Sequence, residues 1–342
     1  LCLEQTLGHR MHAQNLEAAV ERAGLDAESV HVDYPERTRV PVPWALRGSL
    51  QARNRLLARR RRFGSVLFHT QTISLFAPQA SGGAPYVISV DATPRQMDLL
   101  GDHYGHSRSS APLEAAKAAW YRRVFAGAAG FVAWSRWAAD SLRSDYAIGQ
   151  SPVVIAHPGA PRRFFQVERR ESVRPARILF VGGDFERKGG PELLEAFRPL
   201  AGRAELLLVT AADIPAQPGV RVLRDVRPGS PEQLAAFAGA DLFCLPTRGD
   251  CTPVAIGEAL AAGLPVVTTS VGSNSETMGA AEVGRIVPVH DPGALGLALE
   301  ELVDDVALRR RLSRNARALA IERFDADANA SRVLALLREV AA

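Results

Sequence analysis

The chain has 342 residues, which is long for one average domain and suits two. Hydrophobic residues make up 47% and charged residues 23%, a globular composition that excludes a disordered chain, and no apolar run has the length of a membrane span. Three cysteines without metal-ligand spacing exclude a disulfide framework and favour a cytoplasmic protein.

The net charge of +4 is unevenly distributed along the chain. Residues 1–165 contain 20 Lys and Arg against 13 Asp and Glu, whereas the remainder contains 21 against 24. The densest basic run is Arg59–Arg62, which suits either a solvated helix end or contact with an anionic membrane, so peripheral attachment to the inner membrane face stays open. Because no aromatic residues interleave with this run, we do not expect nucleic acid as a partner.

The first half of the chain alternates strand-like and helix-like segments. Short apolar or β-branched runs predict buried strands, and longer segments with helical spacing of apolar residues predict helices. The predicted strands are 2–4, 66–68, 86–90, 130–134 and 153–155, and the predicted helices are 11–23 and 112–126. Ser135 is a suitable N-cap for a further helix.

The second half alternates more regularly. The predicted strands are 177–181, 205–209, 220–223, 241–245, 265–269 and 285–289, and the predicted helices lie near 191–200, 231–238, 253–262 and 294–303. Repeated strand–helix units predict a parallel sheet covered on both faces, which binds ligands at the carboxyl ends of its strands. From residue 306 the pattern is helical, with an interruption near Phe324.

These patterns predict an α/β protein with two doubly wound, Rossmann-like domains. The polar and basic segment 161–175 has no apolar periodicity, which is typical of a domain boundary. We therefore predict an N-terminal domain at 1–165, a C-terminal domain at 166–325 and a final helical segment at 326–342.

The segment Phe180–Gly190 joins a buried strand to a helix through paired glycines and adjacent cations. Gly182 and Gly183 would let a ligand approach the backbone closely, and Arg187 and Lys188 can neutralise a diphosphate. The alternative is a turn with exposed cations. The segment matches neither the phosphate-loop pattern nor the dinucleotide pattern, which argues against an ATPase and against a nicotinamide-dependent dehydrogenase.

A second motif, 245–267, also leads from a strand into a helix. Pro253 suits a first helical turn, and the N–H groups of Val254 and Ala255 would then form an anion site at the helix start. Glu258 lies about one turn further and leans toward that start, so it can hold the ribose of a nucleotide whose phosphate binds there. The alternative is that Glu258 caps its own helix.

Asp250 and Glu258, separated by seven residues, resemble the acid–seven residues–acid signature of the retaining glycosyltransferases of family 4, which have the GT-B fold. The resemblance is strong from about 177 to 289. Three further segments share it in the same order: 182–189, 239–247 and 271–276. The family usually has Glu where this sequence has Asp250, and usually has Arg where this sequence has Gly183.

The resemblance implies two domains that face a central cleft, the first binding the acceptor and the second a nucleoside-diphosphate sugar. It implies that Lys188 and a nearby Arg, here Arg187, contact the donor phosphates. It also implies that Glu258 holds the ribose, that Asp250 contacts the transferred sugar and that the last helix returns to the N-terminal domain. Expected donor contacts are Gly182, Gly183, Thr252, Pro253, Val254, Ala255 and Glu276. No metal or other cofactor is expected.

In the first half, Asp91 ends the strand 86–90 where many family members have a His. A carboxylate there could orient the acceptor hydroxyl or accept its proton, the alternative being an Asx turn or a helix cap before Pro94. The residues that open the first helix are candidate acceptor contacts, the alternative being polar side chains on an ordinary solvent-facing helix surface: Gly8, His9, His12, Gln14 and Asn15.

His103 and His106 have a spacing that could place both on one helix face toward a metal. Gly101 and Gly105 break that helix, so we expect no metal site. Cys251 favours small-residue packing over nucleophilic chemistry, because no His lies close to it in sequence.

The sequence therefore predicts a retaining glycosyltransferase, an enzyme of hexosyltransferase type, that moves a sugar from a nucleoside-diphosphate sugar to an unidentified acceptor. Saccharides, lipid-linked sugars and small molecules are all open as acceptors. One alternative is a catalytically silent GT-B-like protein that binds a nucleotide sugar or assembles a partner, and another is a nucleotide-sugar hydrolase or phosphorylase. The family departures at Asp250, Gly183 and Asp91 leave room for the silent protein.

Overall fold

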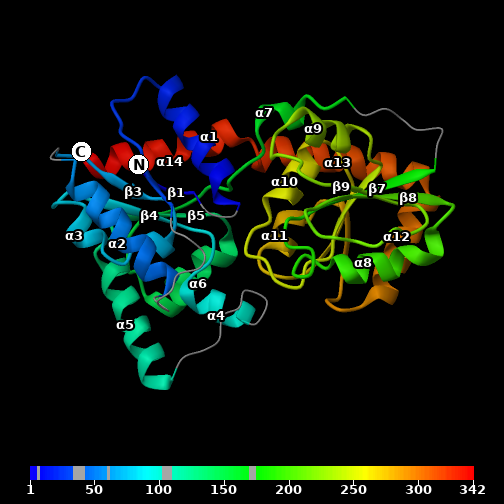
Figure 1. The fold of residues 1–342 in the computed structure, drawn as a ribbon. Coiled ribbons are helices and arrows are strands. Elements are labelled where there is room, and N and C mark those ends of the chain that lie inside the picture. Colours follow the sequence, from blue (N-terminus) through cyan, green and yellow to red (C-terminus); the bar gives the residue numbers. More distant parts are fainter. Residues whose placement is uncertain (6–7, 34–42, 60–61, 102–109, 169–174) are drawn as a thin grey trace. The chain divides into compact units, whose positions relative to one another are not determined.

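The computed structural model describes residues 1–5, 8–33, 43–59, 62–101, 110–168 and 175–342, and the chain divides into two compact units (Figure 1). The first unit comprises Leu1–Pro158 and Ala326–Ala342, and the second comprises Gly159–Asp325. This division falls earlier than the boundary expected after residue 165. Phe164 explains the difference, since it packs into the core of the second unit against Phe237, with 5.2 Å between the ring centroids.

Within the described residues, the first unit is built on a parallel six-stranded sheet with the order β2-β1-β3-β4-β5-β6. Its strands are β1 (Cys2–Glu4), β2 (Val30–Val32), β3 (Val66–Phe68), β4 (Tyr86–Val90), β5 (Gly130–Ala133) and β6 (Val153–Ile155). Its helices are α1 (His9–Arg22), α2 (Trp44–Leu57), α3 (Ala77–Ala80), α4 (Pro94–Leu100), α5 (Ala111–Ala126), α6 (Arg136–Tyr146) and α14 (Ala326–Ala341), with a 3-10 turn η1 (Gln71–Ile73).

Helices cover both faces of this sheet, which is why β3 and β4 read as continuous apolar runs. On one face, Leu16 of α1 and Val333 of α14 pack with Leu67 and Val87. On the other face, α2, α5 and α6 enclose a core that includes Phe125.

The second unit contains, within the described residues, another parallel six-stranded sheet with the order β12-β11-β10-β7-β8-β9. Its strands are β7 (Ala176–Val181), β8 (Ala204–Val209), β9 (Val220–Leu223), β10 (Leu242–Leu245), β11 (Val266–Thr269) and β12 (Gly284–Val287). Its helices are α7 (Arg162–Phe165), α8 (Gly190–Phe197), α9 (Pro231–Ala238), α10 (Val254–Ala261), α11 (Asn274–Met278), α12 (Pro292–Asp304) and α13 (Val306–Arg323), with a 3-10 turn η3 (Arg198–Leu200).

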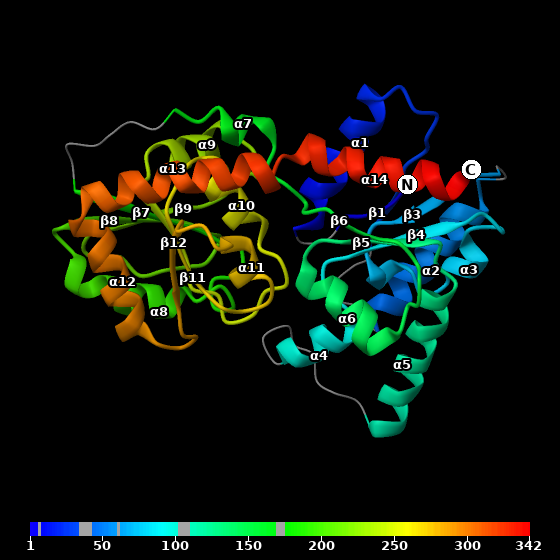
Figure 2. The same cartoon turned by 180° about the vertical axis from the view of Figure 1, so that it is seen from behind.

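Two layers of helices enclose the second sheet. α8 and α12 pack together on one face, while α10 packs with α13 and α7 on the other, as the view from behind in Figure 2 also shows. All strands point the same way, so the loops that follow them gather at one edge.

The predicted fold class, α/β with two doubly wound parallel sheets, is confirmed. The sequence patterns did not predict β2, α2, α3, α4, α7 or the short α11. Pro253 precedes α10 as its N-cap residue instead of lying in the first turn, and β12 ends at Val287 instead of residue 289. Among the helices of the described residues, none has the length and apolar character that a bilayer span requires.

Candidate functional site

Three loops at the carboxyl edge of the second sheet pack directly against one another. They follow β7, β10 and β11, which are neighbours in the strand order. Gly189 has φ +78°, and a Cβ on it would lie 1.9 Å from the carbonyl oxygen of Pro246. Gly272 has φ +57°, and its Cβ would lie 2.1 Å from the carbonyl oxygen of Asp250. Only glycine permits these backbone approaches, so the three loops form one assembly.

The predicted cations Arg187 and Lys188 converge on the predicted acid Asp250. The Lys188 ammonium group pairs with the Asp250 carboxylate. Arg187 Nη1 donates to the carbonyl oxygen of Gly249 at 2.7 Å and lies 3.9 Å from Asp250 Oδ2, while its Nε pairs with Asp184 at 3.0 Å. The side chains of Arg187, Lys188 and Asp250 are 14%, 15% and 9% exposed, so solvent screens these charges only in part.

The paired glycines of the first loop differ in what they offer a ligand. The N–H of Gly182 donates to the carbonyl oxygen of Val209 at 3.0 Å, so it continues the sheet. A Cβ on Gly183 would meet no described atom within 4 Å, so this backbone faces open space. Gly183 also lines a hollow of about 450 Å³ together with Phe185 and Ile214.

The start of α10 lies at the same edge of the sheet. In the described part of the chain, no side chain caps this helix, and Val254 and Ala255 at its start are partly exposed. N–H groups in the first turn of a helix have no carbonyl of the same helix to donate to, so those of Val254 and Ala255 can bind an anion. The Thr252 hydroxyl accepts a hydrogen bond from Ser273 at 3.1 Å, which links the helix start to the loop after β11. α8 and α10 lie on opposite faces, but the loops that precede them meet.

Glu258 is a buried acid in α10, 5% exposed. Burial raises the pKa of its carboxyl group to about 8, and the charge of Arg163 acts in the opposite direction. Because no side chain within the described residues caps α10, the alternative that Glu258 caps its own helix finds no support. A carboxyl group with this pKa keeps its proton at neutral pH and can both donate and accept hydrogen bonds.

Glu276, another expected donor contact, lies in α11 and is partly exposed. Its carbonyl oxygen accepts a hydrogen bond from Arg323 at 3.5 Å. α11 follows the loop after β11, so Glu276 belongs to the same edge of the sheet as the paired cations.

In the first unit, Asp91 and His9 belong to a polar cluster at the carboxyl edge of the sheet. His9 Nε2 lies 3.4 Å from Asp91 Oδ2, and its Nδ1 lies 3.6 Å from Glu4 Oε1. Thr70 donates its hydroxyl to Glu4, and Asp91 Oδ1 accepts the N–H of Ala92 at 2.8 Å. Burial lowers the pKa of His9, but the charge of Glu4, the hydrogen bond with Asp91 and the charge of Asp91 together raise it to about 10. The imidazole is therefore a cation between two carboxylates at neutral pH.

A pair of neutral histidines lies next to His9. His12 Nδ1 and His69 Nε2 are 2.8 Å apart, and the two residues are 3% and 0% exposed. Burial lowers the pKa of His12 to about 3 and holds the pKa of His69 well below its usual value, with neighbouring histidines adding to both shifts. Trp134 packs edge-on against His12, with 4.7 Å between ring centroids. His12, an expected acceptor contact, is thus enclosed by this cluster.

The remaining expected acceptor residues lie around the start of α1. Gly8 and Gln14 are exposed, and Asn15 donates its side-chain amide to the carbonyl oxygen of Pro158 at 3.3 Å. The cap before Pro94 is Thr93, whose side chain accepts the N–H of Gln96, so Asp91 does not cap α4.

Sequence reasoning missed Glu4, His69 and Thr70 as members of this cluster. A signal for all three was present, because Glu4 ends a predicted strand and the other two directly follow one. In a parallel sheet such positions share one edge.

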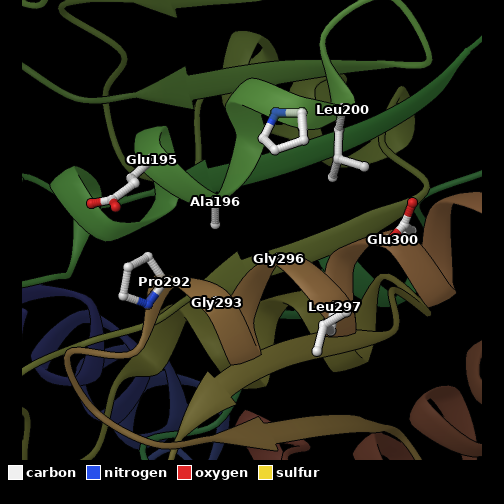
Figure 3. A pocket seen from close by; sticks show the side chains of 9 residues that line it. Glu195, Ala196, Leu200, Pro292, Gly293, Gly296, Leu297 and Glu300 are labelled. Carbon is white, nitrogen blue, oxygen red and sulfur yellow. The ribbon is translucent and has the colours of Figure 1, made fainter.

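A separate groove of about 310 Å³ lies between α8 and α12 (Figure 3). Ala196, Leu200 and Leu297 line it, with Glu195 and Glu300 among its polar residues. It contains no residue of the predicted site.

The described residues contain no group of three or more His, Cys, Asp or Glu that could hold a metal ion. His103 and His106 lie outside the described residues, as do Arg60 and Arg61 of the basic run. Cys251 is buried, 4% exposed.

Two family models match most of the chain between them. The model described as Glycosyltransferase Family 4 matches residues 5–163, and the model described as Glycosyl transferases group 1 matches residues 175–305. The first match spans the first unit from α1 to β6, and the second includes the three loops of the second unit.

Curated relatives share this similarity over part of their length. D-inositol 3-phosphate glycosyltransferase of Paenarthrobacter aurescens is 31% identical over 218 residues, which cover 56% of this chain and 53% of the relative. MMP alpha-(1→4)-mannosyltransferase of Mycolicibacterium hassiacum is 29% identical over 216 residues, which cover 60% of this chain and 52% of the relative. The chain thus spans about half the length of the curated relatives it matches.

Solved structures resemble the fold over nearly the whole chain. Sucrose-phosphate synthase of Thermosynechococcus elongatus has a TM-score of 0.76 at 17% identity, covering 99% of this chain and 95% of that one. WaaG, a glycosyltransferase of lipopolysaccharide biosynthesis, has a TM-score of 0.69 at 15% identity, covering 98% of each chain. Anabaena HepE in complex with UDP has a TM-score of 0.72 at 13% identity, covering 99% of each chain. These likenesses confirm the predicted GT-B fold.

Proposed function

Because the chain belongs to the family 4, group 1 glycosyltransferases, we propose that it transfers a sugar from a nucleoside-diphosphate sugar to an acceptor hydroxyl, with retention at the anomeric carbon. The bond between the anomeric carbon and the diphosphate oxygen breaks, and the diphosphate leaves with the electron pair. The same carbon bonds to the acceptor oxygen, whose proton passes to a base.

The convergence of Lys188, Arg187 and the start of α10 carries this proposal. Two partly buried cations and the leading N–H groups of a helix at one sheet edge suit a pyrophosphate. Such preorganised charges stabilise the negative charge that develops on the leaving diphosphate. Solved neighbours that hold UDP or UDP-glucose support a nucleotide-sugar donor.

Two acids of the second unit, Glu258 and Asp250, would bind the ribose and the transferred sugar of the donor. Glu258, protonated at neutral pH, can donate to one ribose hydroxyl and accept from another. Asp250 can bind hydroxyls of the transferred sugar once the pyrophosphate has engaged Lys188. The hollow beside Gly183 adds open space next to the phosphate-binding backbone.

The polar cluster of the first unit suits the acceptor. His9 is already protonated at neutral pH and cannot accept a proton, so Asp91 is the group that accepts the hydrogen bond of the acceptor hydroxyl and its proton. The names of the relatives specify acceptors such as D-inositol 3-phosphate, which supports a polyol or saccharide acceptor.

We further propose that transfer requires no metal. Lys188 and Arg187 supply two positive charges where the pyrophosphate would bind, which is the charge a divalent cation would otherwise contribute.

The test is donor turnover with a panel of uridine, guanosine, adenosine and thymidine diphosphate sugars. Lys188→Ala and Glu258→Ala are expected to lower kcat/KM for the donor by roughly 100-fold or more, because each removes a charged or buried polar contact. Arg203→Ala is a matched control in the same unit, since this exposed cation pairs only with Glu300 and Asp304 on α12 among the described residues.

Near-normal rates in both site variants would contradict the proposal. Release of free sugar without an acceptor would favour a hydrolase, and nucleotide binding without turnover across an acceptor panel would favour a silent protein.

A further inference from the structure

A two-pronged ion pair joins the loop after β10 to α8. Arg248 Nε donates to Glu192 Oε1 at 2.7 Å, and its Nη2 donates to Glu192 Oε2 at 2.9 Å. The side chains are 23% and 10% exposed, so the pair is shielded from solvent. A bidentate guanidinium–carboxylate pair of this kind fixes orientation as well as distance.

Glu192 also ties in the segment that precedes α12. His290 Nδ1 lies 2.9 Å from Glu192 Oε1, and the backbone of His290 adopts φ +60°. Burial alone would raise the pKa of Glu192, but hydrogen bonds from Arg248 and His290 hold it below its usual value. Glu192 is therefore a carboxylate shared by segments that come from three parts of the sequence.

The backbone beside this ion pair is hydrogen-bonded to Arg187, one of the two cations proposed to bind the pyrophosphate. The N–H of Arg248 donates to the carbonyl oxygen of Arg187 at 2.9 Å, and the Thr247 hydroxyl donates to the same oxygen at 3.2 Å. Thr269 donates to the carbonyl oxygen of Thr247 at 2.6 Å, which extends the connection to β11. The Arg248–Glu192 pair thus anchors a loop that carries Asp250 two residues later.

We propose that Arg248 and Glu192 are positioning residues for the donor pyrophosphate, with the fork between them setting where Arg187, Lys188 and the start of α10 present their charges. This inference rests on the proposed function. Neither residue is proposed to contact the pyrophosphate: Arg248 acts through the loop that carries it, and Glu192 of α8 acts through its pairing with Arg248. Misplacing such a loop by about 1 Å can lower a rate by roughly 100-fold.

A purely structural ion pair is the competing explanation, and the chain offers a matched control for it. Arg285 of β12 makes the same fork with Glu301 of α12, at 2.8 and 2.6 Å, but both residues lie away from the three loops. The control pair is in the same unit and has the same bidentate geometry.

The experiment compares Arg248→Lys and Glu192→Gln with Arg285→Lys and Glu301→Gln in the full chain. Calorimetry measures the Kd of inorganic pyrophosphate, and kinetics measure kcat and KM for donor and acceptor separately. We expect the two loop variants to weaken pyrophosphate binding at least fivefold and to lower kcat/KM for the donor at least tenfold, with the acceptor KM unchanged. Arg248→Lys keeps the charge but loses the fork, so its impairment would show that the bidentate geometry matters in addition to the charge. Each variant is assayed below its own melting temperature, because Glu192 is 10% exposed and Glu301 is 45% exposed, so the loss of the loop pair costs more stability.

Wild-type pyrophosphate affinity and donor kinetics in both loop variants would overturn the inference while leaving the proposed function intact. An equal loss in the control variants would overturn it as well, because any ion pair of this unit would then have the same effect. A wild-type protein that neither binds pyrophosphate nor turns over a donor would remove the proposed function, and this inference with it.

Discussion

Asp250→Asn is predicted to tighten binding of a nucleoside diphosphate and at the same time to slow sugar transfer. Lys188 pairs with Asp250, and Arg187 Nη1 lies 3.9 Å from the same carboxylate. A pyrophosphate that binds these cations competes with Asp250 for them. Asn has nearly the same shape but no charge, so the substitution removes the competitor.

The size of the effect follows from how far this pair is buried. Its side chains are 15% and 9% exposed, and a hydrogen bond to a charged partner contributes about 1.5–3 kcal/mol. If roughly half of that free energy passes to the ligand, binding strengthens by about 0.8–1.5 kcal/mol, which is roughly four- to twelvefold in Kd. Transfer should fall by roughly 100-fold, because the acid that contacts the sugar is lost.

Calorimetry with uridine and guanosine diphosphates measures the first effect, and steady-state kinetics with the corresponding donor measure the second. Asp304→Asn is the control, since Asp304 is an exposed partner of Arg203 and should change neither quantity. Weaker diphosphate binding by Asp250→Asn would refute the competition, since it would mean that the carboxylate helps the anion to bind.

Other predictions follow from the buried groups and the tight loops. The pKa of Glu258 is about 8 in the folded chain, so its contribution to stability is full below about pH 4.5 and is lost as the pH rises through 8, by up to about 5 kcal/mol. Glu258→Gln should reduce this loss when the free energy of unfolding is measured in urea at pH 5 and pH 9. The same loss in the variant as in the wild type would contradict the prediction. The pKa of His9 is about 10, so its contribution to stability is full below about pH 6.5 and is lost as the pH rises through 10. His9→Gln should therefore lower the melting temperature at pH 7 and reduce the fall of the melting temperature toward pH 10. A variant as stable as the wild type at pH 7 would exclude this role for His9. Gly189→Ala should destabilise the chain by more than about 2 kcal/mol, because its Cβ would clash with the carbonyl oxygen of Pro246. Gly202→Ala is the control, since Gly202 also has a positive φ but faces open space, and it should cost only about 1–2 kcal/mol. Equal losses of stability in the two variants would refute the close approach.

The sequence predicts the loops of the second unit well because each chemical group directly follows a strand of a regular β–α pattern. Lys188 and Asp250 could be assigned to one edge before their contact was known, since parallel strands end together. Their direct ion pair was not predictable, because it depends on β7 and β10 being adjacent in the sheet.

The missed parts have physical reasons. Of the four residues that α2 buries, only Leu56 is large and apolar, the others being Gly48, Ser49 and Ala52, and the Ser49 hydroxyl donates to the carbonyl oxygen of Thr72 at 2.9 Å. A helix buried through small and polar residues gives no apolar periodicity. The fork between Arg248 and Glu192 joins residues far apart in sequence, so no local pattern indicates it.

The central claim is that the cations near Lys188 and the start of α10 bind one pyrophosphate, and a crystal structure with a bound nucleoside diphosphate tests it most directly. We predict a phosphate oxygen within hydrogen-bond distance of Lys188 Nζ and of the N–H groups of Val254 or Ala255, with Asp250 released from Lys188. A diphosphate bound in the groove between α8 and α12 would contradict the claim, and so would one that contacts Lys188 without the start of α10 or the start of α10 without Lys188.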